Sequence, residues 1–343
     1  MAALFPAQAK IHPSFSEPEV IVTYAQASGF MNLFAGAAPR VRLGYDDLYV
    51  YVNRLDIRTE SLASQFASNW LPSPSLQAEY EQAQTYLLRN RVVYDRHDIA
   101  AAGRYAIGLP QAYELGMRQG IFQQIRSGAL YGFNAANYEG LMNTQGATNV
   151  TLPDDPYGND TVQSYDNGAM ALFLLQQIVN LKIRMFQSGG NVSNRIVVLS
   201  PQQEFLKFQM ESIIQVTSYQ RPGGGTNTVA GTMQKIVEEA GDTIDWFYDD
   251  TLIGKAPGGL DAIIIAIPEI EVPDIPGTIN TNVFGEVQPS TKAVNVLYSD
   301  VAAPIKISTP TPDGGITEVL EQRVTAGWSW RPQGLSIIAM QYD

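Results

Sequence analysis

The sequence contains no cysteine and only two histidines. The first absence excludes disulfides, thiolate metal sites and cysteine nucleophiles, and it leaves the redox compartment undetermined. His12 stands in a proline-broken segment, and His97 lies in YDRHDIA, where the flanking charges indicate a charged strand or turn. Two histidines are too few for a histidine-rich metal site, and a serine–histidine–aspartate triad would have to use one of them. We therefore predict no catalytic, cofactor or metal site.

Charge is also scarce. Charged residues make up 16% of the chain, against about 25% in an ordinary soluble protein, which favours surfaces that meet other protein. Acidic residues outnumber basic ones by 34 to 22, so the formal net charge is −12. A protein that grips nucleic acid neutralises phosphates with lysine and arginine. Any nucleic acid partner is therefore expected to be confined by this protein and not bound by it.

Membrane and nucleotide signals are missing as well. No apolar run approaches the length of a membrane span. The glycines of RPGGGTN, residues 223–225, lack the lysine and the strand-to-helix setting of a phosphate-binding loop. The opening MAALFPAQAKIHPSFSEPEV has no basic segment followed by an apolar one, so we expect a cytoplasmic product without a signal peptide.

Two acidic clusters are the remaining candidates for chemistry. One contains Asp154, Asp155 and Asp160, and the other contains Asp245, Asp249 and Asp250 beside Trp246 and Tyr248. Such groupings can bind calcium or hydrolyse a glycoside, but neither spacing matches a calcium loop. Solvated loops are the favoured interpretation. A two-domain hydrolase that uses Asp245 or Asp249 near Trp246 is the alternative from a different class of function.

A length of 343 residues predicts two packed domains. Residues 1–45 show neither helical nor strand periodicity and predict an extended arm. Phe5, Phe15, Tyr24, Phe30 and Phe34 give this arm more apolar anchors than a disordered tail usually carries.

A projecting excursion is predicted to follow the arm. DLYVYVNRLDIRT, residues 47–59, alternates as a strand does, and RVVY at 91–94 is its expected partner. Trp70 and the glutamine-rich LQAEYEQAQTYLL lie between them, and the latter is expected to be a short helix. A long excursion that leaves on one strand and returns on another would project from the body of the protein.

Helices and strands then mingle. A helix is predicted over 110–131, with Leu115, Phe122, Ile125 and Ala129 on its apolar face, and a second over 167–188 with a continuous apolar stripe. RIVVLS at 195–200 predicts a buried strand, and Ser200, Pro201 and Gln203 a capped helix start. A helix near 228–241, strands in TIDWFYDD and DAIIIAIPEIEV, and a strand-only end from Ala293 complete an α+β class.

This order of elements resembles the Johnson fold of tailed-phage major capsid proteins. The resemblance is carried by ALYGFNAANYEGLMNTQGA at the end of the first long helix, which is similar to the family's spine helix and its following "G…GLLN" segment. The helix 167–188 followed by NRIVVLSPQQEFLKF and the closing strands with Gly327, Pro332 and Gly334 are further points of similarity. Together these stretches span nearly the whole chain.

The resemblance implies five parts. Residues 1–45 would be the N-terminal arm, 46–100 the extended loop, and 101–200 a peripheral domain with the spine helix at 110–131. Residues 201–285 would be the axial domain, and 286–343 the strands that complete the peripheral and axial sheets.

The resemblance also implies a function without catalysis. Copies of the chain would form hexamers and pentamers of an icosahedral head around double-stranded DNA that is not read by sequence, with separate scaffolding, portal and decoration proteins as further partners and no membrane. The protein would reside in the virion after assembly in the host cytoplasm. The expected inter-subunit contacts are Phe5, Phe15, Tyr24, Phe30, Tyr49, Tyr51, Arg54, Trp70 and Arg91.

One departure from the family concerns lysine. Some members crosslink their shells through a lysine of the extended loop, but no lysine occurs between Lys10 and Lys182. The sequence therefore predicts a noncovalent shell. The nearest alternative is an encapsulin, a compartment with the same fold that holds a cargo enzyme, and the long arm and loop favour the virus.

Overall fold

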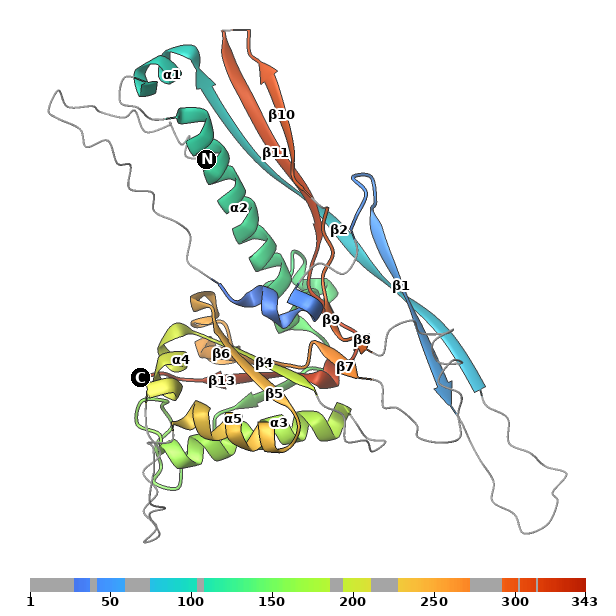
Figure 1. Ribbon diagram of the computed structural model, residues 1–343, viewed down its shortest axis with the longest axis vertical. Coiled ribbons are helices and arrows are strands. Elements are labelled where there is room, and N and C mark those ends of the chain that lie inside the picture. Colours follow the sequence, from blue (N-terminus) through green and yellow to red (C-terminus); the bar gives the residue numbers. More distant parts are fainter. Residues whose placement is uncertain are drawn as a thin grey trace, which may run out of the picture. The chain divides into compact units, whose positions relative to one another are not determined.

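The computed structural model in Figure 1 describes residues 28–37, 42–58, 75–103, 108–185, 194–210, 228–271, 292–301, 303–312 and 314–343. The described residues divide into two compact units. One is built from 89–122 and 305–321, and the other from the described parts of 26–88, 123–304 and 322–343.

The α-helices are α1 Arg96–Gly103, α2 Leu109–Tyr131, α3 Asn167–Met185, α4 Gln202–Met210 and α5 Val229–Glu239. The strands are β1 Tyr49–Arg58, β2 Ser75–Asp95, β3 Thr148–Thr151, β4 Arg195–Ser200, β5 Thr243–Tyr248, β6 Asp261–Ala266, β7 Glu269–Glu271, β8 Lys292–Val294, β9 Val296–Leu297, β10 Ile305–Pro310, β11 Gly315–Thr325, β12 Trp328–Ser329 and β13 Leu335–Met340. Short 3₁₀ turns include η1 Phe30–Leu33 and η5 Asp250–Leu252. No helix of these described residues is long and apolar enough to cross a membrane.

A five-stranded sheet in the order β3-β13-β6-β4-β5 is the centre of the larger unit. Its middle strand β6, DAIIIA, is buried along its whole length, as a continuous β-branched run requires. Side chains alternate between the two faces, so Ile263 and Ile265 enter one apolar core and Ile264 enters the other. The sheet takes strands from both sides of the expected domain boundary at residue 200.

Helices cover the first face of this sheet. Figure 1 shows α3 and α5 side by side on the same side of the strands. The predicted stripe of α3 is buried in this core through Ala171, Leu174, Ile178, Leu181 and Met185. The Thr228 hydroxyl accepts a hydrogen bond from the Gly231 amide at 3.0 Å and caps α5.

The second face is covered by irregular segments and the end of α2. Phe30, Leu33 and Phe34 are fully buried there, and the Phe34 ring lies 4.7 Å from that of Tyr298 in an edge-on arrangement. These residues are core of their own chain, which corrects the assignment of an arm as far as residue 45. Aromatic side chains can anchor an aperiodic segment to the core of its own chain or to a neighbouring subunit. The sequence alone could not show which of these applies to residues 30–34.

The glycines of YGFNAANYEGLMN have a steric cause in the loop that follows α2. Gly140 has φ +86°, and a Cβ there would stand 2.2 Å from the Gly132 amide nitrogen. The Asn143 side chain donates to the Tyr131 carbonyl at 2.6 Å and to the Glu139 carbonyl at 3.2 Å, which closes the loop on the helix end. The stretch that carries the family resemblance is thus a turn that needs these residue types.

In the smaller unit the first half of α2 contacts strand residues of β2 and β10. The Tyr94 and Tyr113 rings stack at 5.9 Å with an interplanar angle of 8°. Lys306 bridges Glu114 at 3.0 Å and Glu318 at 3.1 Å, and the hydrogen bond from Lys306 is the main cause of a lowered pKa for Glu114. Phe122 of α2 is 37% exposed, so its predicted place on the buried face is wrong; Met117 and Ile121 are buried instead.

The glutamine-rich stretch after residue 75 is strand and not helix. β1 pairs antiparallel with β2 from Tyr49↔Gln84 to Arg58↔Ser75, so the expected partner at 91–94 is wrong too. In this strand of the sheet β1-β2-β11-β10, Gln82 and Gln84 are exposed and Ala83 between them is less so, as the alternation of a strand requires. Glutamine, alanine and leucine are good helix formers, but intrinsic propensity is a small energy that pairing across the sheet overrides.

Two helix starts also differ from expectation. YDRHDIA begins the helix α1, where the Asp98 carboxylate accepts from the Asp95 amide at 3.0 Å. α4 begins at Gln202, whose amide donates to the Asp250 carboxylate at 2.9 Å. Ser200 lies in β4, and its buried hydroxyl has no hydrogen-bond partner among the described residues. The cap of α4 thus comes from a residue distant in sequence.

Candidate functional site

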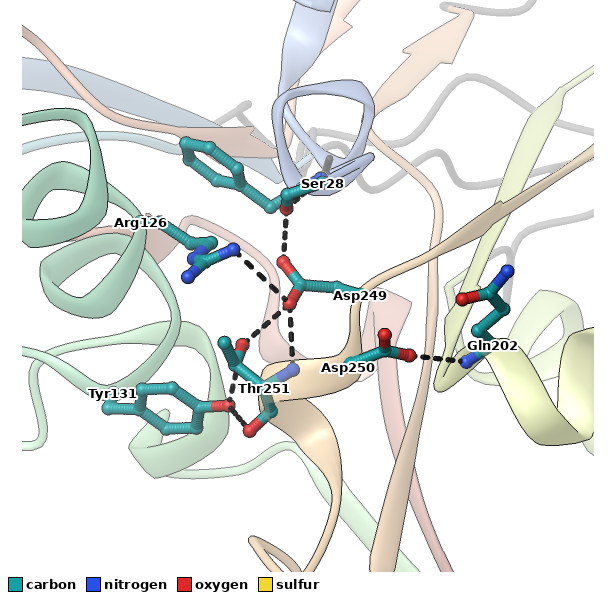
Figure 2. Close-up of polar contacts among 8 residues, drawn as sticks. Ser28, Arg126, Tyr131, Gln202, Asp249, Asp250 and Thr251 are labelled. Atoms are coloured by element: carbon teal, nitrogen blue, oxygen red, sulfur yellow. Dashed lines mark hydrogen bonds and ion pairs between the residues drawn. The ribbon is translucent and has the colours of Figure 1, made fainter. Parts of the chain in front are cut away.

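The acidic cluster after β5 is structural. Asp249 is fully buried; one carboxylate oxygen accepts from the Thr251 amide at 2.9 Å and the Thr251 hydroxyl at 2.6 Å, and the other accepts from the Ser28 hydroxyl. The Arg126 guanidinium lies 3.8 Å from the first oxygen. Figure 2 shows these groups converging on Asp249 from separate segments. A carboxylate with no exposed surface and this many partners cannot reach a substrate.

The neighbouring carboxylates have other partners. Asp250 accepts the amide at the start of α4, as Figure 2 shows, while Asp245 forms an ion pair with Arg195 at 2.7 Å. The Trp246 ring lies 6.0 Å from that of Phe208 and belongs to the margin of the first core. The three aspartates thus make separate structural contacts: Asp249 with the segment at Ser28, Asp250 with α4 and Asp245 with β4. Because Asp249 is fully buried, the solvated-loop interpretation is wrong for it.

The other sequence candidates for chemistry form no site either. Asp155 is buried and accepts the Tyr157 and Asn159 amides at 2.8 Å each, so it organises its own loop. Burial raises the pKa of Asp155, but these hydrogen bonds outweigh it and the net shift is downward. His97 is exposed at the start of α1. The structurally described residues contain no group of three or more histidine, aspartate or glutamate side chains that could hold a metal. His12 and residues 223–225 lie outside them.

A buried carboxyl pair was not anticipated from the sequence. Glu204 of α4 is fully buried and hydrogen-bonded to Asp261 at the start of β6, and the Gln203 amide donates to both carboxyls at 3.2 and 3.0 Å. Burial and the bond to Asp261 raise the pKa of Glu204 to about 8. These surroundings favour the protonated form of Glu204 more than water does. No sequence signal joins two carboxyls 57 residues apart.

The candidate functional surface is an exposed aromatic ladder on the β1–β2 ribbon. Tyr49, Tyr51 and Tyr80 are 47%, 59% and 73% exposed. The Tyr49 and Tyr51 rings lie 6.5 Å apart, and Tyr51 meets Tyr80 edge-on at 6.1 Å. Alternating side chains on β1 and a diagonal cross-strand pair place the three rings on one face of the ribbon. Gln82 and Gln84 occupy the same face, so it carries no charge there.

A cavity of about 380 Å³ lies at the inner end of this ladder. Its walls are Tyr49 of β1, Gln82–Gln84 of β2, Asn137–Glu139 of the loop after α2, and Ala326–Trp328. Tyr138 has a left-handed φ of 56°, an uncommon conformation for a bulky residue, and its side chain is 61% exposed. Glu139 accepts the Tyr86 hydroxyl at 2.8 Å through both oxygens. The surface is thus aromatic and rich in side-chain amides, and its one carboxylate, Glu139, is already hydrogen-bonded to Tyr86.

The structure brings together two of the contact residues predicted from sequence, Tyr49 and Tyr51, and adds Tyr80 to them. Arg91 is exposed on β2. Phe30 has no exposed surface and is corrected to a core residue. Arg54 lies on β1 opposite Glu79 in register. Phe5, Phe15, Tyr24 and Trp70 lie outside the described residues. Tyr80 was missed because its segment was expected to be a helix.

Solved structures of low sequence identity share this architecture end to end. The capsid of Myoviridae Phage XM1 aligns over 95% of this chain and 96% of its own, with a TM-score of 0.66 at 11% identity. The chain has the fold of a phage capsid protein. The capsid of an empty GTA particle matches with a TM-score of 0.56 at 9% identity, over 96% of this chain and 95% of its own. The Cyanophage P-SCSP1u capsid matches with a TM-score of 0.53 at 12% identity, over 98% of this chain and 99% of its own.

The capsid fold confirms the α+β class and the Johnson-fold resemblance inferred from the sequence. No protein-family model and no curated protein sequence matches the chain. Similarity in this case survives in the arrangement of elements and not in residue identities.

Proposed function

We propose that this chain is the major structural subunit of a phage-type capsid. Its copies form hexamers and pentamers that close into an icosahedral shell around double-stranded DNA, in the virion, after assembly in the host cytoplasm. The single observation that carries the proposal is the end-to-end match of the fold to capsid proteins. The involvement of Asp245, Asp249 and Asp250 in structural contacts removes the support for the alternative hydrolase.

The aromatic ladder is the proposed contact surface of the β1–β2 ribbon. A two-stranded ribbon is marginally stable alone, and exposed tyrosines are enriched where proteins meet. Tyr49, Tyr51 and Tyr80 would pack against a neighbouring copy. Arg54, whose position in β1 is on the opposite face of the ribbon, and Arg91 remain predicted contacts apart from the ladder. Phe5, Phe15, Tyr24 and Trp70 remain predicted contacts of the arm and the loop.

The parts of the subunit are proposed as follows. α2 is the spine helix, the ribbon and the residues between its strands form the extended loop, and the five-stranded sheet with α3, α4 and α5 is the axial domain. The N-terminal arm is shortened to the residues before Ser28. Separate scaffolding, portal and decoration proteins are the further proposed partners.

The charge of the chain fits a container for DNA. With a formal charge of −12 the subunit has few cations to spare for phosphates. Each neutralised phosphate adds affinity that packaging and ejection would have to overcome. A weakly interacting wall lets confined DNA move.

The test is assembly of the purified chain, followed by size-exclusion chromatography and negative-stain microscopy. We expect capsomers or closed megadalton particles. Tyr51→Ala/Tyr80→Ala should keep its fold by circular dichroism but assemble poorly, whereas Tyr157→Ala, a change at an 82% exposed tyrosine outside the ladder, should assemble normally. A wild-type chain that stays monomeric at high concentration overturns the capsid proposal. Particles from infected cells or lysates that hold a protein cargo and no DNA overturn the virion assignment.

A further inference from the structure

The outer face of α3 is apolar. The helix exposes Leu172, Gln176, Val179 and Ile183, which follow one another at spacings of four, three and four residues and so form one stripe. Leu172 is 66% exposed, Val179 45% and Ile183 62%. The opposite side of the same helix is buried in the first core. α3 therefore has two apolar faces, and the described residues of the chain cover only one of them.

This pattern is unusual for a helix at a protein surface, where the outer face normally carries charged side chains. α3 contains no aspartate or glutamate, and its two cations stand in the last turn. Lys182 is paired with Asp242, and Arg184 donates to the Asn180 carbonyl at 3.1 Å. The stripe spans roughly 16 Å at 1.5 Å per residue, which is the length of an ordinary helix–helix contact.

We infer that this α3 stripe, residues Leu172, Gln176, Val179 and Ile183, is a contact surface for a second copy of the chain. The inference rests on the proposed capsid function and adds a contact separate from the aromatic ladder. Charge identifies the occupant. Copies with a formal charge of −12 repel one another, so they meet best where no carboxylate is exposed. Arg184, the other cation in the last turn of α3, also suits an acidic partner, and a second copy is one.

The stripe alone is too small for a stable interface, which usually buries about 1,200–2,000 Å². It therefore contributes to assembly together with other contacts. Because its residues are exposed in the single chain, polar replacements should leave the subunit folded and act on association alone.

Val179→Gln/Ile183→Gln tests this prediction. Sedimentation velocity should show that the variant needs a roughly tenfold higher protein concentration to form particles, with thermal unfolding of the dissociated subunit unchanged. Ile253→Gln, at a 47% exposed isoleucine outside the stripe, is the matched control and should assemble as the wild type does. Assembly of the double variant at the wild-type concentration overturns the inference. If the wild type forms no particles, the proposed function itself fails.

The absence of cysteine allows a direct measurement of burial. Ile183→Cys and Ile253→Cys each give the chain one thiol. In particles opened by freeze–thaw, so that a small maleimide reaches both sides of the wall, Ile183→Cys should label roughly tenfold more slowly than in dissociated subunits. Ile253→Cys should label equally in both. Equal labelling of Ile183→Cys, or protection that appears only when a different protein is added, excludes a second copy as the occupant.

Discussion

Asp249 and Glu204 are both buried carboxyl groups, but the charged groups around them differ. Asp249 receives two hydrogen bonds from Thr251 and faces the Arg126 guanidinium. Burial and the neighbouring carboxyl of Asp261 raise the pKa of Glu204. A carboxyl beside a cation and a carboxyl beside another carboxyl stand in opposite electrostatic environments. The two residues therefore respond differently to the same substitution of acid by amide.

Asp249→Asn should be strongly destabilising. The change leaves the Arg126 charge, whose side chain is 10% exposed, without its partner. Breaking a buried pair in this way costs about 3–5 kcal/mol. The measurement is the denaturant midpoint of the dissociated subunit. Asp250→Asn is the control: asparagine can still accept the Gln202 amide, so the change removes only a negative charge at the start of α4 and should cost about 0.3–1 kcal/mol. Equal effects of the two changes would contradict the assignment of Asp249 as the structural centre of its cluster.

Glu204→Gln should remove a dependence of stability on pH. The folded chain holds the Glu204 proton up to about pH 8, while the ordinary pKa is 4.5. The stabilising contribution of this group is therefore complete below about pH 4.5 and lost as pH rises through about 8. Glutamine can donate to Asp261 at every pH.

The thermal midpoint of Glu204→Gln should exceed that of the wild type increasingly between about pH 5 and about pH 9. Glu239→Gln, at an exposed position on α5, should show no such divergence. Parallel curves for Glu204→Gln and the wild type across this range would mean that Glu204 is ionised in the folded protein.

At the scale of elements, the loop after α2 is determined by close approach of backbone. Gly140 and Gly158 share φ +86°, but a Cβ at Gly140 would meet backbone at 2.2 Å, while nothing lies within 4 Å of one at Gly158. Substitutions at these two glycines therefore distinguish the cost of the left-handed backbone conformation, common to both, from the steric clash, found only at Gly140.

Gly158→Ala should cost only the left-handed conformation, about 1–2 kcal/mol. Gly140→Ala adds a clash with the end of α2 and should be clearly more destabilising, to the point of reduced soluble expression. Denaturant unfolding and yield of soluble protein measure both. Similar behaviour of the two variants would show that the loop can move away from the helix.

At the scale of the whole molecule, we predict that a shell of this chain is held without covalent bonds. No cysteine is present, and no lysine occurs between Lys10 and Lys182, which covers the whole β1–β2 segment. Stability must come from buried area over many weak contacts, such as those proposed for the ladder and the α3 stripe.

Boiled, mature particles should therefore give a single monomer band near 37.6 kDa on SDS electrophoresis. The control is a fresh particle sample treated with an amine crosslinker before boiling, which should give a ladder of oligomers and so prove that the gel resolves them. A ladder in the untreated sample would refute the noncovalent shell.

The sequence by itself determined the elements whose periodicity is strong. The helices at 109–131, 167–185 and 229–239 and the buried strands β4 and β6 follow from apolar spacing and from continuous β-branched runs. It also determined what is chemically excluded, because cysteine, extra histidine and a lysine in the loop are simply missing. The order of these elements was sufficient to indicate the fold.

Tertiary structure alone decided the rest, because those properties arise between segments distant in the chain. Residues 75–84 are strand because β1 lies beside them, although their composition favours helix. Phe30 is core, and Tyr80 completes an exposed ladder. Asp249 meets Ser28 and Arg126, and Glu204 meets Asp261. Local composition gives a residue its chemistry, but only its packed neighbours decide whether that chemistry is buried, paired or left open to another copy.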